Sequence, residues 1–117
     1  MAVTETMSPK LLQFDLSSKP TVAGITAPTA QSTWMRGQSA SVHWDVWAIG
    51  AEKVKIYLMQ KSSRAYTKME DCTDNTGCFD YRKVPWGLVM NSDYFIRIVA
   101  HDDDLHFIDS DCFEISV

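Results

Sequence analysis

The sequence predicts an all-β fold, an antiparallel β-sandwich of about seven short strands, on two observations. Apolar and polar residues alternate over strand-length runs, and no segment keeps a helical period for three turns. Residues that favour turns separate these runs, for example at 75–77 and 85–87. Strands at this spacing are typical of sandwiches of the immunoglobulin or fibronectin type.

The first three strands are predicted before residue 60. A weak run at 21–26 ends just before an Ala-Pro turn signal. The run at 39–46 alternates Val and Trp with Ser, His and Asp, as expected of a strand with one buried and one solvated face. The run at 53–59 alternates Val, Ile and Leu with lysine and tyrosine in the same way.

Four more strands are predicted after a turn. Two weaker runs lie at 65–69 and 78–84, and two clear alternating runs lie at 93–100 and 112–117. Tyr94 follows Leu88 by six residues, just before one of these clear runs. This predicts a tyrosine corner, in which the phenol bonds to upstream backbone, and the alternative is an ordinary inward-facing aromatic.

Length and charge limit the possible classes. A chain of 117 residues is predicted to form one sandwich domain over 21–117, after an N-terminal tail at 1–20 in which 11–16 is a candidate edge strand. No apolar run approaches the roughly 20 residues of a membrane span. A net charge of −4 argues against nucleic acid as a partner. The first residues do not form the pattern of a signal peptide.

The three cysteines cannot all pair within one chain. Cys72 and Cys78 bracket a five-residue turn, so this is the pair that the sequence favours for a disulfide. Cys112 is then left over, on the predicted outward face of the last strand. The histidines do not stand at a zinc-site spacing from these cysteines, and no cofactor is expected.

A series of strand, turn and core residues occurs in the order that is found in one family. Its members here are Pro28, Trp34, Gly37, Trp44, Val54, Ile56, Leu58, Gly77, Tyr81, Val84, Pro85, Tyr94, Ser110, Phe113 and Ile115. Over residues 24–117 this series resembles the Kre/Knh-like domain of the fungal cell-wall synthesis family, the Ser/Thr-rich, GPI-anchored wall proteins.

The resemblance implies a module of the extracellular cell wall or cell surface, linked to β-glucan assembly and without catalytic activity. Its implied partner is a cell-wall polysaccharide or another wall or surface protein. The chain departs from the family pattern in its lack of a leader, a Ser/Thr-rich stalk, a GPI signal and an N-glycosylation sequon. A cytoplasmic relative that kept only the fold is therefore the alternative.

Exposed aromatic residues are the candidate ligand-binding groups. Trp47, Tyr57 and Trp86 are predicted at outward or turn positions, where an aromatic face can stack on the apolar face of a sugar ring. His43 and Asp45 are predicted to supply hydrogen bonds to the rim of the ring. The alternative is that these aromatics cover the edges of the core.

Segment 101–111 holds a cluster of carboxylates that makes it a candidate calcium site: Asp102, Asp103, Asp104, Asp109 and Asp111. It does not match the EF-hand loop, and the alternative is a solvated hairpin tip. The same carboxylates crowd one loop rather than a desolvated cleft, and no nucleophile motif is present. We therefore expect no enzymatic activity.

Two functions follow from these observations. The first is a non-catalytic module that binds a β-glucan-like polysaccharide through exposed aromatics. The alternative is a protein–protein interaction domain that forms a homodimer through an edge strand or through Cys112, because edge strands expose unpaired backbone groups.

Overall fold

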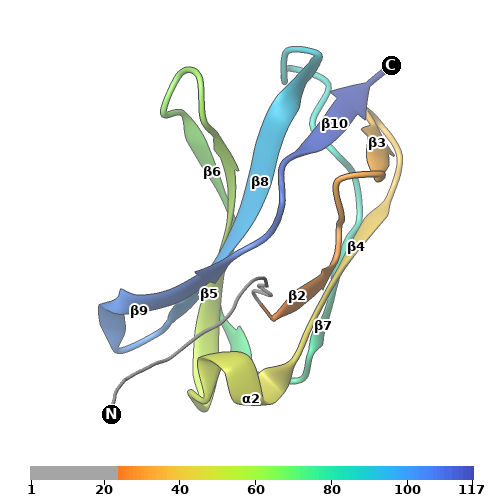
Figure 1. Cartoon of the computed structure of the whole chain (residues 1–117). Coiled ribbons are helices and arrows are strands. Elements are labelled where there is room, and N and C mark those ends of the chain that lie inside the picture. The colour runs from red at the N-terminus through yellow and green to blue at the C-terminus, as the bar shows by residue number, and fades with distance from the viewer. Residues whose placement is uncertain (1–23) are drawn as a thin grey trace, which may run out of the picture.

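Two β-sheets lie face to face in the computed structural model of the protein, which describes residues 24–117 (Figure 1). The larger sheet has the order β3 (Thr33–Met35), β10 (Phe113–Ser116), β8 (Asn91–Ala100), β5 (Lys53–Gln60) and β6 (Tyr66–Asp74), with β9 (Asp103–Asp109) also paired to β8. The smaller sheet has the order β2 (Ile25–Ala27), β4 (Ala40–Trp44) and β7 (Cys78–Tyr81). The predicted all-β sandwich is confirmed.

The first and last strands each occur in two pieces. β2 pairs with β4 in the smaller sheet, whereas β3 pairs in parallel with β10 in the larger sheet. β9 and β10 both pair antiparallel with β8. Between these two strands, Ser110 donates its backbone N–H to the Ile96 carbonyl and accepts the Ile96 N–H on Oγ. The backbone N–H and carbonyl of Ile96 in β8 therefore both have hydrogen-bond partners at the break between β9 and β10.

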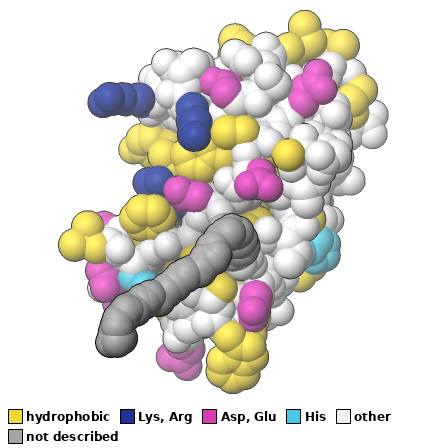
Figure 2. Space-filling model, viewed as in Figure 1, with side chains coloured by type: hydrophobic (Ala, Val, Ile, Leu, Met, Phe, Trp, Pro, Cys, Tyr) yellow, Lys and Arg dark blue, Asp and Glu magenta, His cyan; other side chains and the backbone are white. Residues whose placement is uncertain are grey.

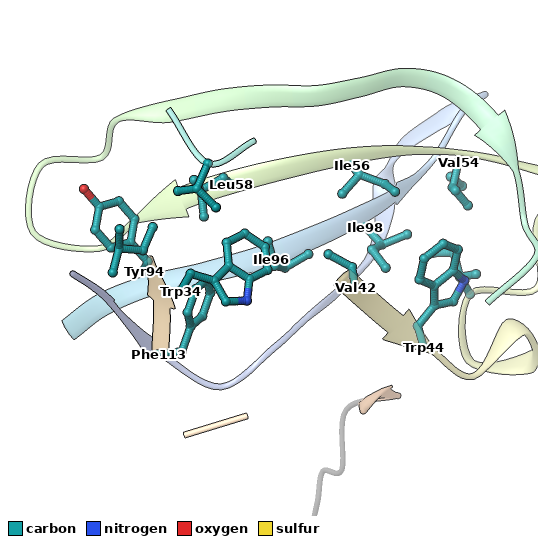
Figure 3. Close-up of a cluster of buried hydrophobic side chains, with 14 residues drawn as sticks. Trp34, Val42, Trp44, Val54, Ile56, Leu58, Tyr94, Ile96, Ile98 and Phe113 are labelled. Atoms are coloured by element: carbon teal, nitrogen blue, oxygen red, sulfur yellow. The ribbon is translucent and has the colours of Figure 1, made fainter. Parts of the chain in front are cut away.

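The core lies between the sheets and contains the inward side chains of the predicted alternating runs (Figure 3). In β5, the buried residues Val54, Ile56 and Leu58 alternate with less buried ones. Trp34 of β3 and Phe113 of β10 bring their rings to 4.8 Å at one end of this core. Trp44 of β4 is buried at the other end, where its indole N–H donates to Asn75 Oδ1.

Several predicted element bounds are wrong: β6 continues to Asp74, five residues past its predicted end, and β7 ends at Tyr81, three residues before its predicted end. The run at 39–46 ends early, because Asp45 caps a one-turn helix, α2 (Val46–Ile49), by accepting the Trp47 N–H. β3 was not expected, and β9 occupies most of the segment that was predicted as a hairpin tip. None of the helices within 24–117 has the length and apolar character needed to cross a membrane.

Part of the predicted domain organisation lies outside the described residues. This applies to the N-terminal tail at 1–20, to its candidate edge strand at 11–16 and to residues 21–23 of the first predicted strand.

The tyrosine corner is confirmed. Tyr94 is buried at the start of β8, and its hydroxyl donates a 2.7 Å hydrogen bond to the Val89 carbonyl. Burial is the main cause that raises the pKa of this phenol, and the charge of Asp93 adds to it. The corner ties the long β7–β8 connection to the body of the sheet.

Replacing Tyr94 by phenylalanine should lower the free energy of unfolding by about 1–2 kcal/mol at pH 7, because the Val89 carbonyl loses its partner. The folded-state pKa is raised, so this contribution is complete below the ordinary tyrosine pKa of about 10 and is lost as the pH rises through the folded-state value. Urea titrations at pH 7 and above pH 10 should show the difference shrinking. Tyr66→Phe, at an exposed tyrosine, is the matched control, and an equal loss there would contradict the assignment.

Candidate functional site

The outward face of the larger sheet carries a strip of aromatic and apolar side chains across β6, β5, β8 and β9. Because Ile56 and Leu58 point into the core, the alternation of β5 turns Tyr57 and Met59 outward. The register places Tyr57 opposite Arg97 of β8. We call this face the outer strip, and it consists of Tyr57, Met59, Tyr66, Phe95, Arg97, Val99 and Phe107.

A shallow groove of about 240 Å³ crosses the outer strip, with lining residues that include Tyr57, Tyr66 and Asp104. The rings of Tyr57 and Tyr66 meet edge to face, with centroids 5.8 Å apart and planes at 82°. Tyr66 lies directly opposite Met59 in the register, which places it diagonal to Tyr57. The pair forms an aromatic wall of which the Tyr66 side is largely exposed to solvent.

Ion pairs surround this groove. Arg97 binds both carboxylate oxygens of Asp109, at 2.7 Å from Nε and 2.9 Å from Nη2, and its guanidinium lies 4.0 Å from the centre of the Phe107 ring. Lys55 lies 2.5 Å from Asp104. The hydrogen bond from Lys55 lowers the pKa of Asp104, and the bond to Asp109 raises the pKa of Arg97. The face therefore presents polar groups whose charges are balanced.

The structure does not bring the five predicted ligand-binding residues together. Tyr57 lies in the groove, but His43 and Asp45 belong to the end of β4, in and just after the smaller sheet. Trp47 is 86% exposed on α2, and Trp86 is 62% exposed on the β7–β8 connection. These tryptophans lie at opposite ends of the sandwich. Trp47 is on α2, which lies at the end where β5 starts, whereas Trp86 lies against Gly37, just after β3, at the other end.

Of the residues of the outer strip, sequence reasoning named only Tyr57 as a candidate, and two of those that it missed show why. Tyr66 stands in a run that was predicted as a strand, but only the strand register places it beside Tyr57. Phe107 stands in a segment that was expected to be a loop tip, so its place opposite Val99 was not foreseeable. The alternation of the runs at 53–59 and 93–100 was the signal in the sequence that pointed to this face.

The structure does not bring the five predicted calcium ligands into one site. Among residues 24–117 no three His, Cys, Asp or Glu side chains gather in a way that suits a metal ion. The extended backbone of β9 spaces the carboxylates apart, and two of them, Asp104 and Asp109, bind cationic side chains. Asp103 accepts the Leu105 N–H instead, and Asp102 and Asp111 are exposed to solvent.

The predicted disulfide is also absent from the structure, in which Cys72 and Cys78 are exposed free thiols. The turn between them is shorter than expected, because β6 continues to Asp74. Cys72 therefore belongs to the larger sheet, whereas Cys78 begins β7 in the smaller one. Cys112 is a third free thiol and is half-buried just before β10.

The split first strand, the two sheets and the tyrosine corner define an immunoglobulin-like domain. The family model of the Kre9/KNH-like N-terminal Ig-like domain matches residues 27–115, and the chain belongs to this family. The family is associated with cell-wall glucan synthesis, and the predicted resemblance is confirmed. No curated protein and no solved structure is significantly similar to the chain.

Proposed function

We propose that the protein is a non-catalytic module of the cell wall or cell surface that binds a β-glucan-like polysaccharide along its outer strip. The observation that carries this proposal is the Tyr57–Tyr66 pair, which forms one wall of a groove on a sheet face that no other element of residues 24–117 covers. The family's association with cell-wall glucan synthesis supports an extracellular location and this class of ligand.

The chemistry of the groove suits a sugar polymer. A hexose ring has an apolar C–H face that can stack on a tyrosine ring, and its rim of hydroxyl groups needs hydrogen-bond partners. Asp104 and Arg97 line the same groove and provide an acceptor and donors. A groove that is open at the surface also accepts a chain of rings rather than one isolated sugar.

The state of the carboxylates supports binding rather than hydrolysis. Glycoside hydrolysis needs one carboxyl group whose pKa is raised, so that it can donate a proton to the leaving oxygen. Lys55 lowers the pKa of Asp104, and Asp109 is held by both nitrogens of a guanidinium fork. We therefore propose that these groups orient a ligand and do not transfer protons.

Replacing Tyr57 or Tyr66 by alanine should weaken binding of β-glucan oligosaccharides about tenfold, which equals about 1.4 kcal/mol of binding free energy. The reason is the loss of one stacking face of the groove. Isothermal titration calorimetry of the full chain with linear β-glucan oligosaccharides measures this effect.

The matched controls are Trp47→Ala and Trp86→Ala, which remove larger exposed aromatics from other parts of the surface and should leave the glucan affinity unchanged. Binding that depends on these tryptophans and not on the tyrosines would place the site elsewhere. The absence of a heat signal with every oligosaccharide at millimolar concentration would overturn the proposed function.

A further inference from the structure

Five exposed apolar side chains belong to segments at the end of the sandwich where Figure 1 places the C-terminus. These side chains are at least two-fifths exposed, and they are Met35 (41%), Trp86 (62%), Val89 (59%), Met90 (55%) and Val117 (60%). Contacts join the segments that carry them, because Arg36 Nη1 donates to the carbonyls of Trp86 and Leu88 and Met35 pairs with Ser116. We call this surface the apolar end patch. Exposed apolar side chains on neighbouring segments are typical of an interaction site.

A hollow of about 200 Å³ adjoins the apolar end patch at Val89. Leu58, Leu88 and Tyr94 line its inner side, and Tyr66 lines its outer side. It opens where the smaller sheet does not cover the end of β5 and β6. An interface needs such a pocket for a buried anchor side chain, usually an aromatic one.

Positive charge surrounds the same end. Lys61 and Arg64 are exposed in the β5–β6 turn, and Arg82 and Lys83 are exposed after β7. None of the ion pairs found within residues 24–117 includes any of these four side chains. The carboxylates near them accept hydrogen bonds from uncharged groups: Asp93 from Ser62 and Gln60, Asp80 from Ser41, and Glu114 from Thr33. A partner for this end should therefore carry negative charge.

The opposite end of the same molecule has the complementary properties. Trp47 is 86% exposed on α2, and Leu105 is 89% exposed on β9 nearby. The carboxylates of Glu52, Asp102 and Asp103 lie around them and take part in no ion pair within the described part of the chain. Figure 2 shows Lys and Arg side chains only in the upper half of the visible face, whereas Asp and Glu side chains lie in both halves and reach the end at which α2 lies.

We propose that copies of this protein associate head to tail, with the acidic end of one copy docked on the apolar end patch of the next and Trp47 seated in the hollow. Opposite charges orient the two ends, and the buried tryptophan supplies the apolar contact. The two surfaces in contact differ, so the interface is heterologous and leaves a free end on each side. Association therefore continues beyond a dimer into linear chains. Tyr66 lines both this hollow and the groove of the outer strip, but the inference uses no other residue of that groove and stands without the proposed function.

Sedimentation velocity of the full chain over a wide concentration range tests the proposal. The weight-average sedimentation coefficient should rise with concentration without a plateau at the dimer, and 0.5 M salt should reduce it by screening the charges. Trp47→Ala removes the anchor, and Val89→Glu places a carboxylate at the mouth of the hollow. Each variant should associate about tenfold more weakly.

Mixing the two variants gives the sharpest result. Trp47→Ala keeps an intact apolar end patch, and Val89→Glu keeps an intact acidic end, so an equimolar mixture should form a one-to-one dimer and nothing larger. Thr26→Glu adds the same charge to an exposed position of β2 and should associate as the unmodified chain does. Unchanged circular dichroism melts show that the variants are folded.

Three outcomes would overturn the proposal. The first is a chain that stays monomeric at all concentrations and salt strengths. The second is association that stops at a dimer, which indicates a self-complementary interface. The third is a dimer that is lost in reductant or in Cys112→Ser, which assigns the contact to that thiol.

Discussion

Replacing Phe113 by alanine should lower the free energy of unfolding by about 3–5 kcal/mol. Phe113 is 1% exposed, and its ring packs against Trp34 at 4.8 Å. Its strand, β10, pairs with both β3 and β8, so the cavity opens where two strand ladders meet. Neighbouring side chains cannot collapse into it without breaking those ladders. A loss of this size is a large fraction of the total stability of a small domain.

Phe107→Ala is the matched control, because Phe107 is 39% exposed on the outer strip. That substitution deletes the same ring but loses mainly the contact with the Arg97 guanidinium, which is about 1 kcal/mol. Chemical denaturation of both variants measures the difference. Equal losses would show that the end of the core at β10 is not closely packed.

The sequence predicts the core well because the core depends on local alternation. Once Ile56 faces inward in β5, the pleat places its neighbours two residues away on the same face, and no information about other strands is needed. The tyrosine corner was predictable for the same reason, since Tyr94 and Val89 are five residues apart. Both features need only the order of residues along one segment.

The outer strip was only partly predictable, because its residues meet through the register of four strands. Tyr57 was predicted to face outward, but its partner Tyr66 is found only when β5 and β6 are aligned with their register shifts. Segment 101–111 was misinterpreted for a related reason. Its carboxylates suggested a solvated tip or a cation site, whereas pairing with β8 and with Lys55 and Arg97 makes it a strand. Tertiary pairing outweighed the local preference of Asp for loops.

The exposed tryptophans show a second limit of the sequence. Trp47 and Trp86 were grouped with Tyr57 because all three are aromatic and outside the predicted core, but residue type does not say which end of a sandwich a residue occupies. In the structure, Trp47 and Trp86 lie at opposite ends of the two sheets. Charge then distinguishes the two ends: within residues 24–117, lysine and arginine side chains near Trp86 and carboxylates near Trp47 take part in no ion pair.

Replacing Asn75 by alanine should lower the free energy of unfolding by about 3 kcal/mol, because one amide satisfies three groups at the acidic end. Asn75 Oδ1 accepts the Trp44 indole N–H at 2.7 Å, and Nδ2 donates to the carbonyls of Val46 at 3.0 Å and Ala51 at 2.8 Å. Trp44 is buried, so its N–H has no access to water as a substitute.

Asn91→Ala is the matched control, because the exposed Asn91 side chain bonds only its neighbour Ser92 within the described residues. This substitution should change the free energy of unfolding by less than about 0.5 kcal/mol.

The two carbonyls that Asn75 binds belong to the first residue of α2 and to the residue after its C-cap, and α2 carries Trp47. The Asn75 variant should therefore also show faster amide hydrogen exchange in α2 than in β8, whereas a loss spread evenly over the domain would mean that the amide does not hold this end together. A less stable α2 in the Asn75 variant should weaken head-to-tail association more than it weakens glucan binding. The reason is that α2 lies outside the groove between Tyr57 and Tyr66.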